Sequence, residues 1–99
     1  MKNIVVSGTN SVSEEIARSL ANSLSAELCK PIYKVFPDGE SYVRLPCNVK
    51  DSKAIVVQSL INPQDKSIIE TILLGDATKE SGAEDQLLVS PYLAYSRQD

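Results

Sequence analysis

Residues 36–45 carry several side chains of the types that bind nucleosides. Phe36 offers a flat ring, and Arg44 adds a cation a few residues later. Asp38 and Glu40 place carboxylates on either side of a glycine. An aromatic ring can stack on a base, while carboxylates accept hydrogen bonds from an amino group or a ribose hydroxyl. Nucleoside recognition is therefore one interpretation. The other is an ordinary Pro-Asp-Gly turn, with Phe36 in the core.

A second group of such side chains closes the sequence, in the run PYLAYSRQD at residues 91–99. Arg97 offers a planar fork for a phosphate or a base. Gln98 can pair with a base edge, and Asp99 can accept from an amino group or a hydroxyl. A purine nucleotide would use all three side chains. The alternative is a polar tail that is merely solvated.

Two further groups of residues have simpler interpretations. The loop at residues 8–11, Gly-Thr-Asn-Ser, precedes a predicted helix and could cradle a phosphate there. It lacks the spacing of the dinucleotide and P-loop fingerprints, so we interpret it as a connecting loop. Asp65 and Glu70 fall in the first turns of a second predicted helix, where acids are favourable, and we assign them structural roles.

Composition narrows the chemistry further. The 99 residues include no histidine, which excludes a histidine-based triad, general base or metal ligand within the chain. The serines have no such base to activate them, and no cluster has metal-ligand spacing, so we assign neither a nucleophile nor a metal site. The formal net charge is -3 and no run of lysine or arginine occurs, so neither nucleic acid nor a membrane surface is an expected partner.

Cys29 and Cys47 lie far apart without metal-type spacing, and nothing in the sequence demands that they pair. We expect two small buried or half-buried thiols, with a disulfide as the open alternative. No stretch approaches the roughly 20 apolar residues of a membrane span, and the first residues run directly into a strand pattern. We therefore expect a cytoplasmic protein.

Hydrophobic periodicity predicts the elements that position these groups. Asn3–Ser7 reads as a strand, and Ser11 followed by Glu14 predicts a capped helix start. Over residues 12–24 the apolar side chains recur every four positions, which predicts an amphipathic helix. Its expected buried face consists of Ile16, Ala17, Leu20, Ala21 and Leu24.

A hairpin is predicted next. Pro31–Phe36 and Ser41–Leu45 read as its strands, with a turn in which proline takes the second position and Gly39 accepts a positive φ. Alternation along the second strand turns Val43 and Leu45 to one side and the residues next to them to the other. A hairpin that stands off the sheet could carry its tip to a neighbouring subunit.

The remaining elements complete an alternating order. Ala54–Gln58 and Gln86–Ser90 read as strands around a helix that starts at Asn62 and Pro63 and ends before Gly82. The expected buried face of this helix is Ile68, Ile69, Ile72, Leu73 and Ala77. The order β-α-β-β-β-α-β predicts an α/β fold with a mainly parallel sheet and an antiparallel hairpin. Two helices are few for covering both faces of such a sheet, which suggests that part of the fold lies outside these residues or in a partner.

The chain resembles the N-terminal part of the ribose-phosphate diphosphokinases, also called phosphoribosyl pyrophosphate synthetases, and most closely their archaeal type. The resemblance covers essentially all 99 residues and rests above all on FPDGE at residues 36–40 and PYLAYSRQD at residues 91–99. It is supported by the strand and Gly8 loop at the start, and by PQDK at residues 63–66. It implies an incomplete phosphoribosyltransferase-like N-terminal domain, with the rest of that domain and a C-terminal domain beyond residue 99.

The family transfers the diphosphoryl group of ATP to the C1 hydroxyl of ribose 5-phosphate, releases AMP and requires Mg²⁺. By resemblance, the chain belongs to a homo-oligomer, a dimer or larger, with ATP at a subunit interface. The adenosine would be held by Phe36, Asp38 and Glu40 of one subunit and by Arg97, Gln98 and Asp99 of another. The family's metal ligands and ribose-phosphate loop would follow residue 99. We therefore expect the chain to supply ATP recognition and to be inactive alone.

Two other functions remain open. One is a non-catalytic nucleotide-binding or regulatory subunit of the same fold, which would pair with an active enzyme. The other is a small α/β module that binds protein rather than nucleotide.

Overall fold

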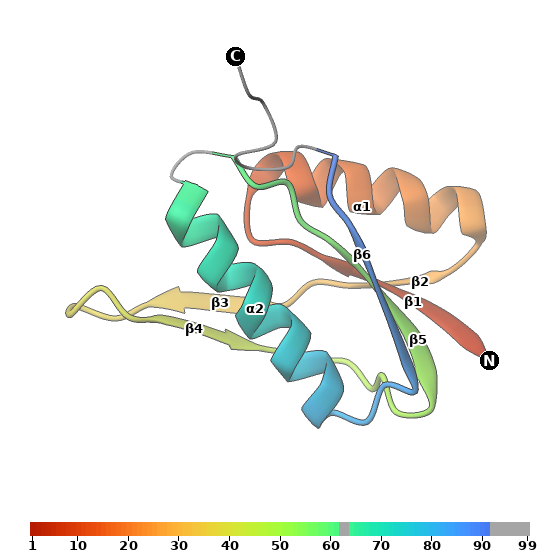
Figure 1. The fold of residues 1–99 in the computed structure, drawn as a ribbon. Coiled ribbons are helices and arrows are strands. Elements are labelled where there is room, and N and C mark those ends of the chain that lie inside the picture. Colours follow the sequence, from red (N-terminus) through yellow and green to blue (C-terminus); the bar gives the residue numbers. More distant parts are fainter. Residues whose placement is uncertain (62–63, 92–99) are drawn as a thin grey trace, which may run out of the picture.

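The computed structural model of the chain describes residues 1–61 and 64–91, apart from the side chain of residue 64. Of the two helices in these residues, neither has the length and apolar content that a bilayer-spanning segment needs. The elements are, in chain order, β1 (Lys2–Ser7), α1 (Ser11–Leu24), β2 (Glu27–Cys29), β3 (Ile32–Val35), β4 (Ser41–Arg44), β5 (Ser52–Val57), α2 (Gln64–Glu80) and β6 (Asp85–Val89) (Figure 1).

The central sheet has four parallel strands in the order β2-β1-β5-β6. β1 and β5 lie in the middle and pair from Lys2 opposite Ser52 to Ser7 opposite Val57. Both strands are buried on both faces, which is why each reads as a continuous apolar run rather than as an alternating one. The predicted α/β fold with a mainly parallel sheet and an antiparallel hairpin is confirmed.

Each face of the sheet carries its own apolar core. On one face, α2 and the β3–β4 hairpin cover a cluster of Ile4, Val6, Cys29, Val49, Ala54, Val56 and Leu74 (Figure 1). Val43 and Leu45 pack against this cluster, as their alternation predicts. On the other face, α1 covers a cluster of Val5, Ala17, Ala21, Ile55 and Val57. Successive residues of β1 and β5 thus enter opposite cores, because side chains of a strand alternate between the faces.

The start and the face of α1 differ from the prediction. Asn10, not Ser11, is the N-cap, and its side chain accepts a hydrogen bond from the Ser13 backbone N–H at 2.8 Å. Glu14 bonds Lys30 and Arg18 instead of completing a capping box. The buried line of the helix is Ser13, Ala17 and Ala21, with Ile16 and Leu20 half-buried beside it and Leu24 exposed. Small residues occupy this line because the helix lies close against the sheet.

The buried face of α2 also differs from the prediction. Its most buried residues are Ser67, Glu70, Leu74 and Thr78, of which only Leu74 is apolar and Glu70 is charged. Ile69 and Ile72, which were expected in the core, are 55% and 59% exposed. The stripe of apolar residues predicted the wrong buried face, because polar groups at the ends of the strands bind the side chains that α2 turns inward. The predicted helix start at residues 62–63 lies outside the described residues.

Two further expectations need correction. The strand β2 was not predicted, since its three residues are too few to show a period, and it forms by pairing with β1 from Ile4 opposite Glu27 to Val6 opposite Cys29. The expected pair of free thiols is a disulfide between Cys29 and Cys47, with 6.0 Å between their Cα atoms. The pairing of β2 with the sheet brings Cys29 beside the segment that follows β4, and neither contact is visible in the local sequence.

Candidate functional site

The hairpin forms as its turn chemistry predicts. β3 and β4 pair from Ile32 opposite Arg44 to Val35 opposite Ser41. The turn is closed by the Gly39 N–H, which donates to the Phe36 carbonyl oxygen at 2.8 Å. Gly39 has a φ of +88°, a conformation that glycine adopts without steric cost. The hairpin extends beyond α2 and away from the central sheet (Figure 1).

Phe36 lies at the base of the turn and is 38% exposed. Its ring centroid lies 6.0 Å from that of Tyr42, and the Lys34 Nζ lies 5.2 Å above the Phe36 ring. The ring is therefore accessible and has a cation beside it, so it could accept a further flat group. The alternation of β3, which places Lys34 two residues before Phe36, was the signal that could have identified this lysine.

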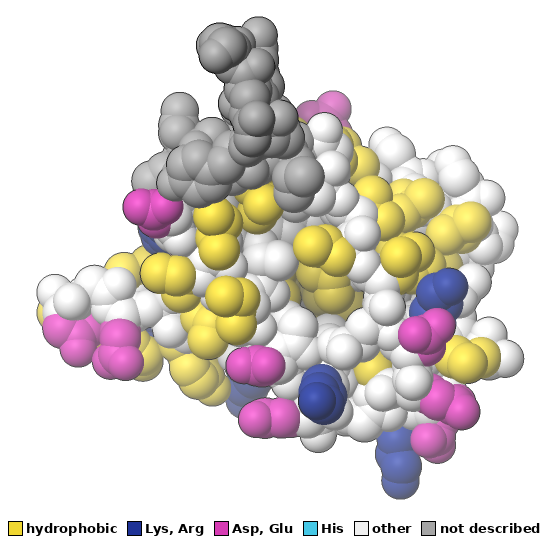
Figure 2. All heavy atoms as spheres, in the orientation of Figure 1, with side chains coloured by type: hydrophobic (Ala, Val, Ile, Leu, Met, Phe, Trp, Pro, Cys, Tyr) yellow, Lys and Arg dark blue, Asp and Glu magenta, His cyan; other side chains and the backbone are white. Residues whose placement is uncertain are grey.

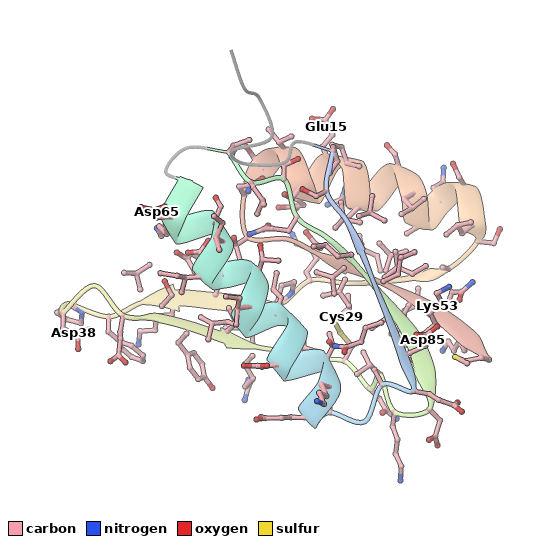
Figure 3. The ribbon with its side chains drawn as sticks, in the orientation of Figure 1. Glu15, Cys29, Asp38, Lys53, Asp65 and Asp85 are labelled. Atoms are coloured by element: carbon pink, nitrogen blue, oxygen red, sulfur yellow. A yellow bond between two sulfur atoms is a disulfide. The ribbon has the colours of Figure 1, made fainter. Side chains whose placement is uncertain are left out.

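The hairpin brings two of its predicted carboxylates together. Asp38 and Glu40 are both exposed, and Asp38 lies at the far end of the turn (Figure 3). The Asp38 Oδ1 accepts a hydrogen bond from the Glu40 backbone N–H at 3.0 Å, so this carboxylate also stabilises the turn. Arg44 pairs with Ile32 at the opposite end of the hairpin and does not join the group. The tip is therefore acidic, with an aromatic ring at its base.

A cavity of about 520 Å³ separates the hairpin tip from α2. Its lining residues are Gly39, Glu40, Ser41, Lys66, Ile69 and Leu73. Figure 2 shows apolar side chains gathered over the hairpin and α2, with acidic groups at the hairpin tip. The cavity joins an apolar wall to a carboxylate, a hydroxyl and an ammonium group, the combination that small-molecule sites commonly present.

A polar network joins the carboxyl ends of β1 and β5 to α2. The Gln58 side chain, which is fully buried, accepts from the Thr9 backbone N–H and donates to the Thr9 hydroxyl, both at 2.9 Å. The Thr9 hydroxyl in turn donates to the Glu70 Oε1 at 2.6 Å. A Cβ on Gly8 would collide with the Gln58 side chain and the Val57 carbonyl oxygen, so glycine permits the close approach.

This network favours the interpretation of residues 8–11 as a connecting loop. The backbone N–H of Thr9 is bound by Gln58, and that of Ser13 is bound by Asn10. The Asn10 side chain also donates to the Ser59 carbonyl oxygen at 3.0 Å. The Thr9 and Asn10 donors hold the loop to the residues that follow β5, and the Ser13 donor closes the helix cap, so none of these three is directed at a phosphate.

Glu70 is more than the favourable first-turn acid that its position suggested. Its side chain is buried, and it also contacts Ser41 of the hairpin and Lys66 one turn earlier on α2. The Lys66 ammonium lies 5.5 Å from the ring centroid of Tyr33 on β3. The Tyr33 side chain, and after it the Glu70 carboxylate, raises the pKa of the Lys66 ammonium above its ordinary value.

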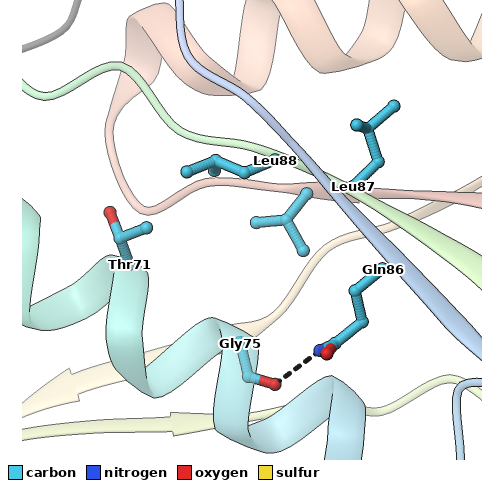
Figure 4. A pocket seen from close by; sticks show the side chains of 6 residues that line it. Thr71, Gly75, Gln86, Leu87 and Leu88 are labelled. Atoms are coloured by element: carbon cyan, nitrogen blue, oxygen red, sulfur yellow. Dashed lines mark hydrogen bonds between the residues drawn. The ribbon is translucent and has the colours of Figure 1, made fainter.

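A second cavity of about 250 Å³ lies between α2 and β6. Val56, Thr71, Gly75, Gln86, Leu87 and Leu88 line it (Figure 4). The Gln86 side chain spans one end and donates to the Gly75 carbonyl oxygen at 2.7 Å. The Gln86 amide and the Thr71 hydroxyl are both bound within the protein and the other side chains are apolar, so this cavity offers few groups that could fix a polar ligand.

Several predicted site residues lie outside the described part of the chain. Arg97, Gln98 and Asp99 are not described, so their distance from the hairpin tip is not defined. Within the described residues, no three His, Cys, Asp or Glu side chains gather in a way that could hold a metal ion. We therefore assign no Mg²⁺ ligand to these residues.

Comparisons with known proteins bear on this arrangement. Residues 4–99 match the family model described as the N-terminal domain of ribose phosphate pyrophosphokinase. A curated ribose-phosphate pyrophosphokinase of Saccharolobus solfataricus is 44% identical over 93 residues, which are 94% of this chain and 31% of that relative. The chain thus spans about a third of the length of the curated relatives that it matches.

Solved structures agree with the fold. A phosphoribosylpyrophosphate synthetase from Mycobacterium smegmatis superposes with a TM-score of 0.87 at 26% identity, over 100% of this chain and 33% of that one. A purine phosphoribosyltransferase from Pyrococcus horikoshii superposes with a TM-score of 0.65 at 13% identity, over 96% of this chain and 66% of that one. The second likeness shows the shared fold alone.

Proposed function

We propose, since the chain belongs to the family of ribose phosphate pyrophosphokinase N-terminal domains, that it is part of an enzyme that makes phosphoribosyl diphosphate. The reaction moves the β,γ-diphosphoryl group of ATP to the C1 hydroxyl of ribose 5-phosphate and leaves AMP. The relatives are about three times as long as this chain, and we propose that the 99 residues are inactive alone.

We assign adenosine recognition to the hairpin tip. The observation that supports this role is the presence of an accessible Phe36 ring beside Asp38 and Glu40 on an element that projects from the sheet. The ring would stack on the adenine, which keeps the base out of water on one face. The free oxygens of the two carboxylates would accept hydrogen bonds from the adenine amino group or the ribose hydroxyls.

The site would be completed by a second copy of the chain. Arg97, Gln98 and Asp99 of that copy would approach the base from the side opposite Phe36, within a homo-oligomer. Arginine would stack on the base or bind a phosphate, and the two polar residues would bind the base edge or the ribose. We further propose Mg²⁺ as the cofactor that neutralises the phosphate charge, with its ligands supplied by the polypeptide that follows residue 99.

The test is to join residues 1–99 to the two thirds of the Saccharolobus solfataricus relative that follow its matched region. We expect this fusion to release AMP from ATP and ribose 5-phosphate in the presence of Mg²⁺. Phe36→Ala should weaken ATP binding by about 1–3 kcal/mol, the contribution of one base–aromatic stack. Steady-state kinetics with ATP as the varied substrate would measure the effect as a rise in KM.

Phe36→Tyr is the matched control, because it keeps the aromatic face and should leave the KM for ATP close to that of the parent fusion. No AMP release by the parent fusion would contradict the proposed reaction. An unchanged KM in Phe36→Ala, in an active fusion, would remove the hairpin from the ATP site.

A further inference from the structure

Glu70 is an acid in an interior position near the middle of α2. Its residue is only 4% exposed, although a carboxylate is costly to bury unless hydrogen bonds and charges compensate it. An aliphatic side chain of similar length would fill the same space. The role of this carboxylate is therefore inferred from the groups that bind it.

The two oxygens of Glu70 are bound by different segments. Oε1 accepts a hydrogen bond from the Thr9 hydroxyl at 2.6 Å, in the loop after β1. Oε2 accepts one from the Ser41 hydroxyl at 3.4 Å, at the first residue of β4. The Lys66 ammonium lies 3.9 Å from the same Oε2. One side chain thus connects the strand ends of the sheet to the hairpin.

We infer that Glu70 is a positioning residue, whose carboxylate fixes the hairpin tip relative to the carboxyl ends of β1 and β5. The inference rests on the proposed function, because it gives the adenosine-binding tip a defined distance from the strand ends where the rest of the substrate would lie. Ser41 directly follows Glu40, so a link at Ser41 acts close to the proposed ligand groups.

The sheet side of the link is held firmly. Gln58 has no exposed surface and binds both the backbone N–H and the hydroxyl of Thr9, which fixes the orientation of that hydroxyl. Because the hydroxyl accepts from Gln58, its own proton is directed to Glu70. The hydrogen bonds therefore form a directed chain from Gln58, the residue after β5, through the Thr9 hydroxyl to Glu70 of α2.

The hairpin side needs such a link because its apolar contacts lie elsewhere. Val43 and Leu45 pack against the core toward the base of the hairpin. Toward the tip, a cavity opens between the hairpin and α2, and the Ser41 hydroxyl reaches α2 by its hydrogen bond to the Glu70 carboxylate. The contact of Lys66 with the Tyr33 ring lies nearer the base, because Tyr33 pairs with Val43. Without Glu70, the tip would be held mainly from its base.

Three variants of the 99-residue chain separate positioning from packing. Glu70→Met keeps the length of the side chain but makes neither hydrogen bond. Glu70→Gln keeps both, since its amide oxygen can accept from Thr9 and its amide N–H can donate to the Ser41 oxygen. Ser41→Ala removes only the hydrogen bond between the hairpin and Glu70. Because this change is small, the variant should fold even if Glu70→Met does not. Asp76→Asn, an exposed change on the same helix, controls for charge.

The readout is the orientation of the hairpin, measured by residual dipolar couplings of backbone amides. In the parent chain, Glu70→Gln and Asp76→Asn, one alignment should fit the amides of β1, β5, β3 and β4 together. In Glu70→Met and Ser41→Ala, the β3 and β4 couplings should shrink and depart from that alignment. In the fusion protein described above, Ser41→Ala should raise the KM for ATP about fivefold, the effect of one lost hydrogen bond. Its kcat should stay within about twofold, as expected for a loss of uniform binding.

Hairpin couplings that stay on the common alignment in both Glu70→Met and Ser41→Ala would overturn the inference. A lost alignment with an unchanged KM for ATP would show that Glu70 positions the hairpin but would overturn the link between that position and ATP binding. A parent fusion that makes no AMP would instead contradict the proposed function, while the couplings would still decide whether Glu70 positions the hairpin.

Discussion

At the residue scale, the contact between Gly8 and Gln58 sets how closely the first loop approaches β5. We predict that Gly8→Ala destabilises the chain by about 1–3 kcal/mol, the usual cost of overpacking. The added Cβ would meet the Val57 backbone oxygen, which cannot rotate away, as well as the Gln58 side chain and the Ser13 Cβ. Urea unfolding followed by circular dichroism would measure the loss.

Gly75→Ala is the matched control for this prediction. A Cβ there meets no atom within 4 Å, and Gly75 lies within α2. Alanine should therefore be neutral or stabilise the helix by up to about 1 kcal/mol. Equal unfolding midpoints for the two variants would show that the approach at Gly8 is looser than described.

Single residues could be predicted where their neighbours are local in sequence. Phe36, Asp38 and Glu40 share one turn, so turn chemistry alone brought them together. Glu70 could not be predicted as part of the same assembly, because its partner Thr9 lies 61 positions away. Only the parallel pairing of β1 with β5, and the packing of α2 against them, creates that contact.

At the element scale, the Cys29–Cys47 disulfide ties the edge strand β2 to the segment after the hairpin. The bridged residues are 18 positions apart. A closed loop of that length restricts the unfolded chain enough to stabilise the fold by about 3 kcal/mol. We therefore predict that a phosphine reductant lowers the free energy of unfolding by about this amount, as measured by urea titration.

Cys47→Ala provides the control for the reduction experiment. It removes the bridge but leaves Cys29, the more buried of the two, in place. This variant should match the reduced chain in stability and should not respond to the reductant. A parent chain with the same unfolding midpoint in both redox states would contradict the prediction.

Elements with a clear period or a strong turn signal were predictable, whereas faces set by distant partners were not. β1, β5 and the hairpin were anticipated because their patterns are local. The stripe of isoleucines on α2 pointed to the wrong face, because Glu70 and Thr78 find polar partners toward the sheet, in Thr9 and Gln86. β2 was not predicted, because its pairing with β1, and not its own composition, makes it a strand.

At the scale of the whole molecule, β6 is an edge strand of the described sheet, and its first four residues are exposed. Leu87 and Leu88 point to opposite faces of the strand and are 45% and 48% exposed. An edge strand with exposed apolar side chains is a template for pairing with another chain. We predict that the 99-residue chain self-associates through β6, and that Leu88→Lys raises the dissociation constant about tenfold.

Sedimentation velocity over a series of concentrations would measure this association. Leu24→Lys is the matched control, since Leu24 on α1 is 46% exposed and undergoes the same chemical change. It should leave the dissociation constant unchanged. If it weakened association as much as Leu88→Lys does, the contact would not be specific to β6.

The position of the disulfide has a consequence for how the hairpin can change over evolutionary time. The bond closes a covalent ring that contains β3, the turn and β4. Both ends of this ring are anchored beside the first core. Insertions, deletions or new side chains at the tip would therefore be insulated from the register of β1 with β5. If the tip binds adenosine as proposed, ligand preference could change within this ring while the sheet that carries it stays the same.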